Sequence, residues 1–191
     1  MGKLLIDSVR HGKPCPFALF SLGKFGGEEL GSGSDLEILL VYSDSGETPG
    51  PEKIRFGEFY ETVARQLLQT LETRSGGTFA LDARLRPHGE SGPLAVSLSA
   101  WREYYGKGGG ALDYEKQALI RLRPIQSDVS LSGEIIRLRD EIVYTRPPVS
   151  IGHTLELHAR QIVLHAPAGG GWNAKYGPGG LAELEYSVQF L

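Results

Sequence analysis

The chain has 191 residues, of which 40% are hydrophobic and 23% are charged, so it can bury the core of one globular domain, with or without a small appendage. Its 20 Lys and Arg residues nearly balance its 23 Asp and Glu residues. We therefore expect neither a nonspecific nucleic-acid binder nor a polybasic membrane surface. One cysteine excludes an intrachain disulfide and a thiolate metal cluster. Without a signal-like start or an apolar run of ~18 residues, the sequence predicts a cytoplasmic protein with no membrane partner.

The first half of the chain predicts a mixed β-sheet with helical cover. Phe17 to Leu22 and Leu36 to Tyr42 are apolar runs typical of strands, and a glycine-rich loop, Gly23 to Ser34, joins them. From Glu52 to Thr73 the apolar residues recur at helical spacing, which predicts an amphipathic helix. Thr78 to Arg86 predicts the next strand.

A further strand is expected at Leu94 to Ser97, followed by a helix that begins with Ser99 as its N-cap. This helix carries three aromatic residues, for which we expect packing of the helix against the sheet rather than base stacking. They are Trp101, Tyr104 and Tyr105.

After these strands the pattern is mainly helical, because four segments show helical periodicity. They are Ala111 to Arg123, Ser132 to Tyr144, Gly152 to His165, and Leu181 to Leu191. The last pattern runs to the final residue, which suggests a fragment of a longer protein. We therefore predict an α+β fold, in which a mixed-sheet domain over residues 1–127 precedes a helical segment over residues 128–191, truncated at its C-terminus.

Carboxylates cluster on two of the predicted strands. Asp35 and Glu37 alternate with apolar residues, so both project from one face at the start of a buried strand. Asp82, Arg84 and Arg86 share a face of the Thr78 to Arg86 strand in the same way. If the two strands are neighbours, three carboxylates surround a site for divalent cations, which neutralise like charges that would otherwise repel. The alternatives are a solvated strand end, and structural pairing of the arginines with Asp82.

Four motifs follow one another along the chain: GKFGGEELGSGSDLE at 23–37, DARLRPHG at 82–89, EKQAL at 115–119 and KYGPGGLAELEY at 175–186. Taken together, they resemble the ordered motifs of the glutamine synthetase adenylyltransferase family, of the DNA polymerase beta-type nucleotidyltransferase superfamily. The resemblance implies transfer of AMP from ATP to a tyrosine hydroxyl of glutamine synthetase, with Mg²⁺ or Mn²⁺, in the regulation of nitrogen assimilation.

The resemblance also implies residue roles. Asp35, Glu37 and Asp82 would be the catalytic and metal-binding residues. The implied nucleotide-binding residues are Gly23, Lys24, Gly26, Gly27, Ser34, Arg84, Arg86 and Glu185.

Two departures from the family leave alternatives open. The family usually has Asp where this chain has Glu37. One alternative is therefore a regulatory module without turnover, which binds nucleotide or a regulatory partner such as the PII signal protein. The second departure concerns direction. The motifs at 31–34 and 82–89 look more like a unit that adds AMP, which we favour, whereas Lys175 to Gly180 looks more like a unit that removes AMP by phosphorolysis.

Overall fold

The computed structural model describes residues 16–31, 33–43, 46–49, 53–75, 80–145 and 173–189, together with positions 152, 156, 159, 160 and 163. The chain divides into two compact units, Met1–Thr145 and Arg146–Leu191. The first unit contains the sheet and its helices. The described part of the second contains α8 (Leu181–Gln189).

A five-stranded mixed sheet forms the centre of the first unit, as the sequence predicts. Its central strand is β2 (Leu36–Tyr42), which pairs antiparallel with β1 (Phe17–Ser21). On its other side, β2 pairs in parallel with β3 (Leu81–Asp82) and, further along, with β4 (Ala95–Ser97). The fifth strand, β5 (Arg123–Ser127), pairs antiparallel with β1. β2 is central because its run of apolar residues can be buried on both faces.

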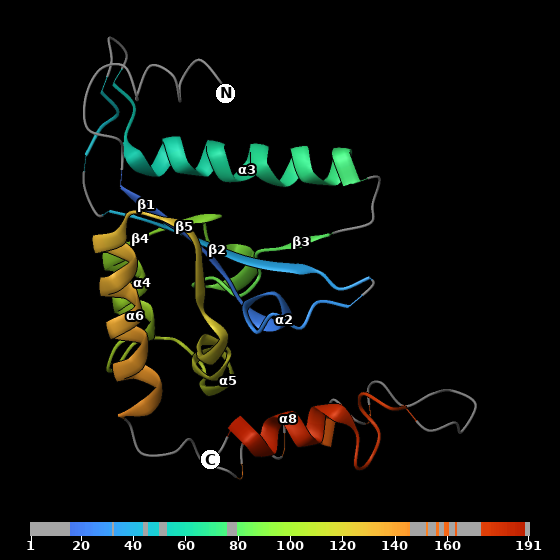
Figure 1. Cartoon of the computed structure of the whole chain (residues 1–191). Coiled ribbons are helices and arrows are strands. Elements are labelled where there is room, and N and C mark those ends of the chain that lie inside the picture. Colours follow the sequence, from blue (N-terminus) through green and yellow to red (C-terminus); the bar gives the residue numbers. More distant parts are fainter. Residues whose placement is uncertain are drawn as a thin grey trace. The chain divides into compact units, whose positions relative to one another are not determined.

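Helices cover the two faces of this sheet (Figure 1). α3 (Phe56–Ser75) packs its apolar side, including Phe59 and Tyr60, against one face. The opposite face is covered by α4 (Leu98–Tyr105) and α6 (Val129–Tyr144). Because side chains alternate along a strand, Leu40 of β2 packs in the core under α3. Its neighbours Leu39 and Val41 pack in the core on the opposite face, with α4 and α6.

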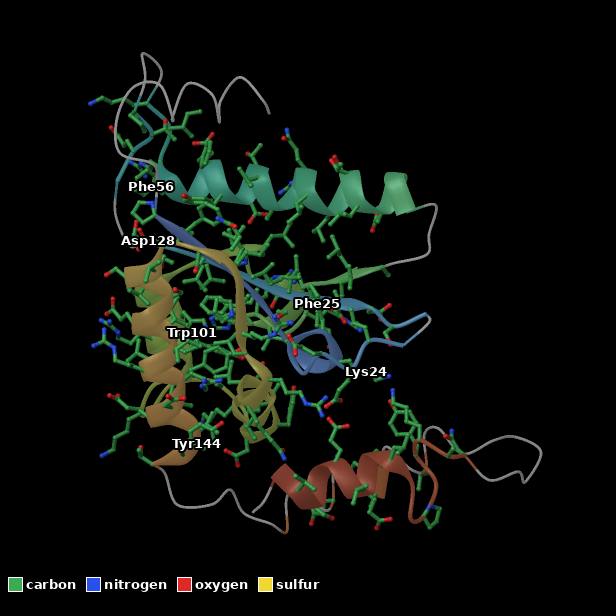
Figure 2. The ribbon with its side chains drawn as sticks, viewed as in Figure 1. Lys24, Phe25, Phe56, Trp101, Asp128 and Tyr144 are labelled. Carbon is green, nitrogen blue, oxygen red and sulfur yellow. The ribbon has the colours of Figure 1, made fainter. Side chains whose placement is uncertain are left out.

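The aromatic residues of α4 pack as expected. Trp101 and Tyr105 are fully buried, and Tyr104 is 9% exposed. Figure 2 shows Trp101 among the side chains packed between the helices and the sheet. The predicted N-cap is displaced by two residues, because it is the side chain of Ser97, not Ser99, that accepts the backbone N–H of Ala100.

The prediction of one helix from Ala111 to Arg123 is wrong. The helix α5 (Asp113–Ala118) ends early, the 3₁₀ turn η2 (Leu119–Arg121) follows, and the chain then enters β5. Pro124 explains the change, because a proline lacks the N–H that an interior helical residue donates and pushes the preceding residue to an extended backbone. As a strand, β5 has a register shift where Pro124 pairs with Phe20.

The strand predicted from Thr78 to Arg86 is also wrong in its extent. Of its described residues, only Leu81 and Asp82 belong to β3. The chain then turns, and a second 3₁₀ turn, η1 (Gly89–Ser91), precedes β4. Asp82 is therefore the last residue of its strand, so Arg84 and Arg86 do not share a strand face with it.

The boundary between the compact units falls after Thr145 rather than near Ser127, because α6 belongs to the core of the sheet. Leu131 and Ile135 of α6 are buried in the same cluster as Trp101. The helix predicted from Gly152 to His165 lies largely outside the described residues, so the helical character of that segment stays a prediction. In the part of the chain that the structure describes, no helix is both long and apolar enough to cross a membrane.

α2 (Gly23–Gly26) packs so closely against the segment before β5 that Gly26 has no room for a side chain. A Cβ atom at Gly26 would lie 1.9 Å from the carbonyl oxygen of Arg121, so we expect Gly26→Ala to lower the free energy of unfolding by about 1–3 kcal/mol. The matched control is Gly133→Ala on α6, where an added Cβ meets nothing within 4 Å. There we expect a gain of about 0.5–1 kcal/mol.

Urea unfolding followed by circular dichroism measures both variants. Equal effects of the two substitutions would contradict the tight junction between α2 and the Arg121 backbone.

Candidate active site

The pairing of β2 with β3 brings the predicted carboxylates to one edge of the sheet. Glu37 and Asp82 are register partners in this parallel pair, and the backbone N–H of Leu36 donates to the carbonyl of Ala80 over 2.8 Å. Partners in a parallel ladder project to the same face. Asp35 immediately precedes β2 and is exposed. Strands that are far apart in sequence thus set Glu37 beside Asp82, with Asp35 two residues before Glu37.

The carboxylate of Glu37 turns toward the first residues of α2, a single helical turn where the sequence predicted only a loop. Its Oε2 atom accepts the backbone N–H of Lys24 over 3.0 Å. Gly23 has a φ of +47°, and a Cβ there would lie 1.6 Å from the same Oε2. The backbone conformation favours glycine at this position, and a larger residue would also displace the Glu37 carboxylate.

Burial raises the pKa of Glu37 above its ordinary value, and the negative charges of Asp82 and Asp35 raise it further. The N–H of Lys24 and the charge of Arg121 act in the opposite direction without cancelling the rise in pKa. Asp82 and Asp35 therefore both lie close enough to Glu37 for their charges to act on it.

The pKa of Asp82 shifts in the opposite direction to that of Glu37, because Arg84 forms an ion pair with the Asp82 carboxylate. The guanidinium of Arg84 donates from Nε to Oδ1 and Oδ2 over 3.0 Å each, and from Nη2 to Oδ2 over 2.6 Å. Its backbone N–H adds a bond of 2.8 Å to Oδ1. Burial raises the pKa of Asp82, but the hydrogen bonds and charge of Arg84 outweigh it, so the pKa lies below its ordinary value.

Arg86 serves the fold of the loop that follows β3. It is 7% exposed, and its guanidinium donates to the backbone carbonyls of Ala83, Glu90 and Gly92. Arg86 thus stabilises the loop through backbone carbonyls, a role that the sequence did not suggest. Ser34 is likewise part of a turn, since its Oγ accepts the N–H of Gly31 over 3.2 Å.

The glycine-rich segment is held in place by an arginine that the sequence analysis missed. Arg123 of β5 donates from Nε to the carbonyl of Gly26 and from Nη2 to that of Phe25, both over 3.0 Å. It therefore caps the end of α2, while Lys24 stays exposed on the outside of the turn (Figure 2). Pro124 is the sequence signal that could have identified this role of Arg123. A residue before proline favours an extended backbone, and Arg123 reaches α2 from such a strand.

The donor chemistry of this edge fits a divalent cation, since carboxylate oxygens are the ligands that Mg²⁺ prefers. Over the described residues, however, no three His, Cys, Asp or Glu side chains are grouped as a metal site. The hydrogen bonds give the reason, because Glu37 turns to the N–H of Lys24 and Asp82 turns to Arg84.

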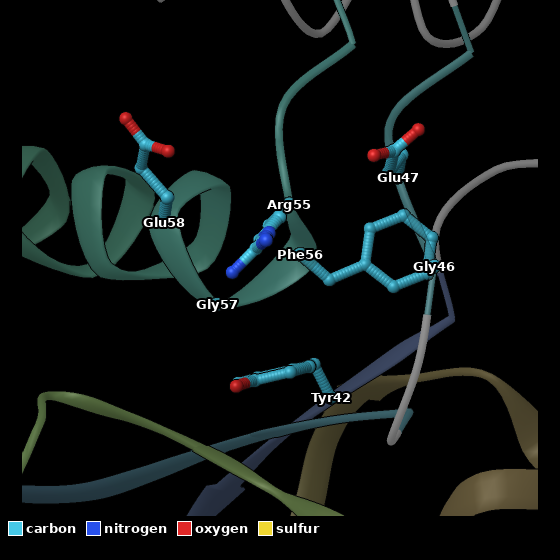
Figure 3. Close-up of a pocket in the computed structure, with 7 residues that line it drawn as sticks. All are labelled: Tyr42, Gly46, Glu47, Arg55, Phe56, Gly57 and Glu58. Carbon is cyan, nitrogen blue, oxygen red and sulfur yellow. The ribbon is translucent and has the colours of Figure 1, made fainter.

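Glu185 is exposed on α8, in the second unit, and its predicted role in the nucleotide site stays a prediction. A hollow of about 660 Å³ lies at the opposite end of β2 from Glu37 (Figure 3). Its lining residues are Tyr42, Gly46, Glu47, Arg55, Phe56, Gly57 and Glu58.

The opposite pKa shifts predict opposite effects of neutralising the two paired carboxylates. The folded-state pKa of Glu37 is raised, so its ionised form costs stability once the pH exceeds that pKa. We therefore expect Glu37→Gln to be more stable than the native chain at pH 7, with the difference shrinking as the pH falls toward 4. The folded-state pKa of Asp82 is lowered, so its contribution is present at neutral pH and is lost on acidification.

Asp82→Asn should accordingly be less stable than the native chain at pH 7, with a smaller deficit at low pH. Urea unfolding of both variants across this pH range is the measurement. Changes of the same sign in the two variants would contradict the charge distribution described here.

Comparison with known proteins identifies the family to which the chain is similar. A family model described as glutamate-ammonia ligase adenylyltransferase matches residues 6–136, the stretch that contains all three carboxylates. A solved toxin–antitoxin structure with AMP-PNP covers 85% of this chain and 93% of its own, but a TM-score of 0.33 at 11% identity does not establish a shared fold.

Curated relatives carry the name bifunctional glutamine synthetase adenylyltransferase/adenylyl-removing enzyme. The protein of Idiomarina loihiensis is 34% identical over 94% of this chain and 20% of its own length. That of Methylococcus capsulatus is 34% identical over 94% of this chain and 19% of its own. This chain thus spans about a fifth of the length of these relatives. The family match and these identities show that the chain belongs to the glutamate-ammonia ligase adenylyltransferase family.

Proposed function

We propose that this chain carries the carboxylate site of a nucleotidyltransferase that moves AMP from ATP to a tyrosine hydroxyl of glutamine synthetase. The observation that carries the proposal is the register of Glu37 with Asp82 beside Asp35, in a chain of this family. Glu37 on β2, Asp82 on β3 and Asp35 just before β2 repel one another unless positive charge offsets their repulsion, so their presence together favours a role in catalysis.

In this proposal Asp35, Glu37 and Asp82 hold Mg²⁺ or Mn²⁺. The cation supplies positive charge that offsets the developing charge of an in-line phosphoryl displacement. The hydroxyl oxygen of the tyrosine attacks the α-phosphorus of ATP, the bond to pyrophosphate breaks, and the hydroxyl proton passes to a base. Asp82 stays ionised at neutral pH because its pKa is lowered, so it can serve as a ligand and help to position the hydroxyl.

The glycine-rich turn and the nearby cations face the triphosphate in this proposal. Lys24 is exposed on α2 and Arg84 is exposed beside Asp82, so both can approach a polyphosphate group. The backbone N–H of Lys24 is now bonded to Glu37. It becomes available to a phosphate oxygen only when the Glu37 carboxylate turns away. Glu185 is proposed to support the nucleotide from the second unit, as the family motif at 175–186 suggests.

The reverse reaction is the second candidate. The name of the relatives includes an adenylyl-removing activity, and the same carboxylates would promote attack of phosphate on AMP-modified glutamine synthetase. A regulatory module without turnover, with PII as its partner, is the third candidate. Glu37 favours it, because its longer side chain is bound to backbone rather than directed to a cation.

Transfer of radiolabelled AMP to purified glutamine synthetase tests the first proposal. We expect label on the synthetase in the presence of ATP and Mg²⁺ or Mn²⁺, and a loss of at least about a hundredfold in Asp35→Asn and Asp82→Asn, because charge stabilisation of this kind is worth several kcal/mol. Asp113→Asn on α5 is the matched control and should keep full activity.

Phosphate-dependent release of AMP from pre-modified synthetase, without forward transfer, would assign the chain to removal. Nucleotide binding without either reaction would favour the regulatory module. Full activity of Asp35→Asn and Asp82→Asn would contradict the carboxylate site.

Glu37→Asp tests how the longer side chain affects the rate. Aspartate is one methylene shorter, so it cannot reach the N–H of Lys24 from the same strand position and stays beside Asp35 and Asp82. We expect the transfer rate to rise by about three- to tenfold, equivalent to about 0.7–1.4 kcal/mol. An unchanged or lower rate, measured at saturating Mn²⁺, would show that the Glu37 contact does not limit the reaction.

A further inference from the structure

Both oxygens of the Asp82 carboxylate are occupied by Arg84. Oδ1 accepts the backbone N–H and Nε, and Oδ2 accepts Nε and Nη2, with donor–acceptor distances between 2.6 and 3.0 Å. A carboxylate in this state offers few lone pairs to a cation. A divalent cation can therefore coordinate Asp82 only after the guanidinium has moved.

The two partners differ sharply in their exposure to water. The Asp82 side chain is 13% exposed, whereas that of Arg84 is 64% exposed. A carboxylate that is so largely removed from water needs a positive partner, because an unpaired buried charge is costly. The guanidinium, in contrast, lies at the end of a flexible chain in solvent and loses little on leaving.

The surroundings of the pair are negative. Glu37 is the register partner of Asp82, and Asp35 lies two residues before Glu37 at the start of β2. Without a cation, the edge of the sheet would therefore hold neighbouring like charges. Arg84 reduces that repulsion from within the chain.

We propose that Arg84 is an internal counter-cation, which occupies Asp82 while the site lacks a divalent cation and is exchanged for that cation when it binds. This inference rests on the proposed metal-dependent function. The exchange replaces one positive charge on Asp82 by two and involves no covalent step. Arg84 is thus a positioning residue, and it sets the affinity of the site for its cation by competing for the same two oxygens.

Binding of Mn²⁺ to the full 191-residue chain tests the competition directly, with free Mn²⁺ followed by electron paramagnetic resonance up to millimolar concentrations. We expect Arg84→Ala to bind Mn²⁺ about three- to tenfold more tightly than the native chain. The reason is that Mn²⁺ no longer has to displace the guanidinium, and an ion pair this exposed is weak enough for its loss to change the affinity by no more than about tenfold. Arg84→Lys keeps the charge but not the planar fork, so its affinity should fall between the two.

Arg65→Ala is the matched control. Arg65 donates to Glu61 over 3.1 Å and is 63% exposed, so its loss makes the same change in charge at a similar ion pair on α3. Its Mn²⁺ affinity should equal that of the native chain. Asp82→Asn should lose Mn²⁺ binding.

Thermal unfolding supplies a second readout. If Arg84 stands in for the cation, Arg84→Ala should unfold at a lower temperature than the native chain without Mn²⁺, and the difference should narrow at saturating Mn²⁺. A purely structural role for Arg84 would lower the unfolding temperature equally in both conditions.

The outcomes separate the inference from the function on which it rests. Mn²⁺ binding that depends on Asp82 but is unchanged or weakened in Arg84→Ala would overturn the role of Arg84 and leave the proposed site standing. No Mn²⁺ binding by the native chain or by any variant would overturn the cation site, and the inference with it.

Discussion

The parallel pairing of β2 with β3 is the constraint on which the candidate site depends, because it sets Glu37 beside Asp82. Hydrogen bonds of the ladder and the buried residues of β2 hold the two strands together against the repulsion between their carboxylates. The raised pKa of Glu37 and the lowered pKa of Asp82 are two results of the same proximity. At Glu37, burial and the neighbouring carboxylates outweigh the Lys24 N–H and the charge of Arg121, whereas at Asp82 the hydrogen bonds and charge of Arg84 outweigh burial.

The remaining contacts of this edge compensate its charge and fix its neighbours. The N–H of Lys24 meets Glu37, and Arg84 meets Asp82. Arg123 then fixes the turn that carries Lys24, by binding the carbonyls at its end. Three separate parts of the chain, α2, the segment after β3 and β5, therefore converge on the start of β2. This arrangement explains how the chain can keep an acidic edge folded.

Much of this fold could be predicted from local patterns, and the errors have identifiable causes. β2 was found with its observed bounds because a buried central strand is a continuous apolar run. β5 was missed because its residues are largely exposed and contain Pro124, so neither period nor composition marks a strand. The alternation rule placed Arg84 and Arg86 on the face of Asp82, but the strand ends at Asp82, and where a short strand ends depends on tertiary pairing. For the site, the sequence identified the carboxylates, whereas the partners of each depend on side-chain packing that no local pattern specifies.

A crystal structure of the chain with Mn²⁺ and a non-hydrolysable ATP analogue would test the central claim most directly, because anomalous scattering locates Mn²⁺ independently of the protein density. Our account predicts Mn²⁺ bound by oxygens of Asp35 and Asp82, with the triphosphate over the turn at Gly23 and Arg84 withdrawn from Asp82. Nucleotide and Mn²⁺ bound elsewhere, for example in the hollow beside Tyr42, with the Asp82–Arg84 pair intact, would contradict it.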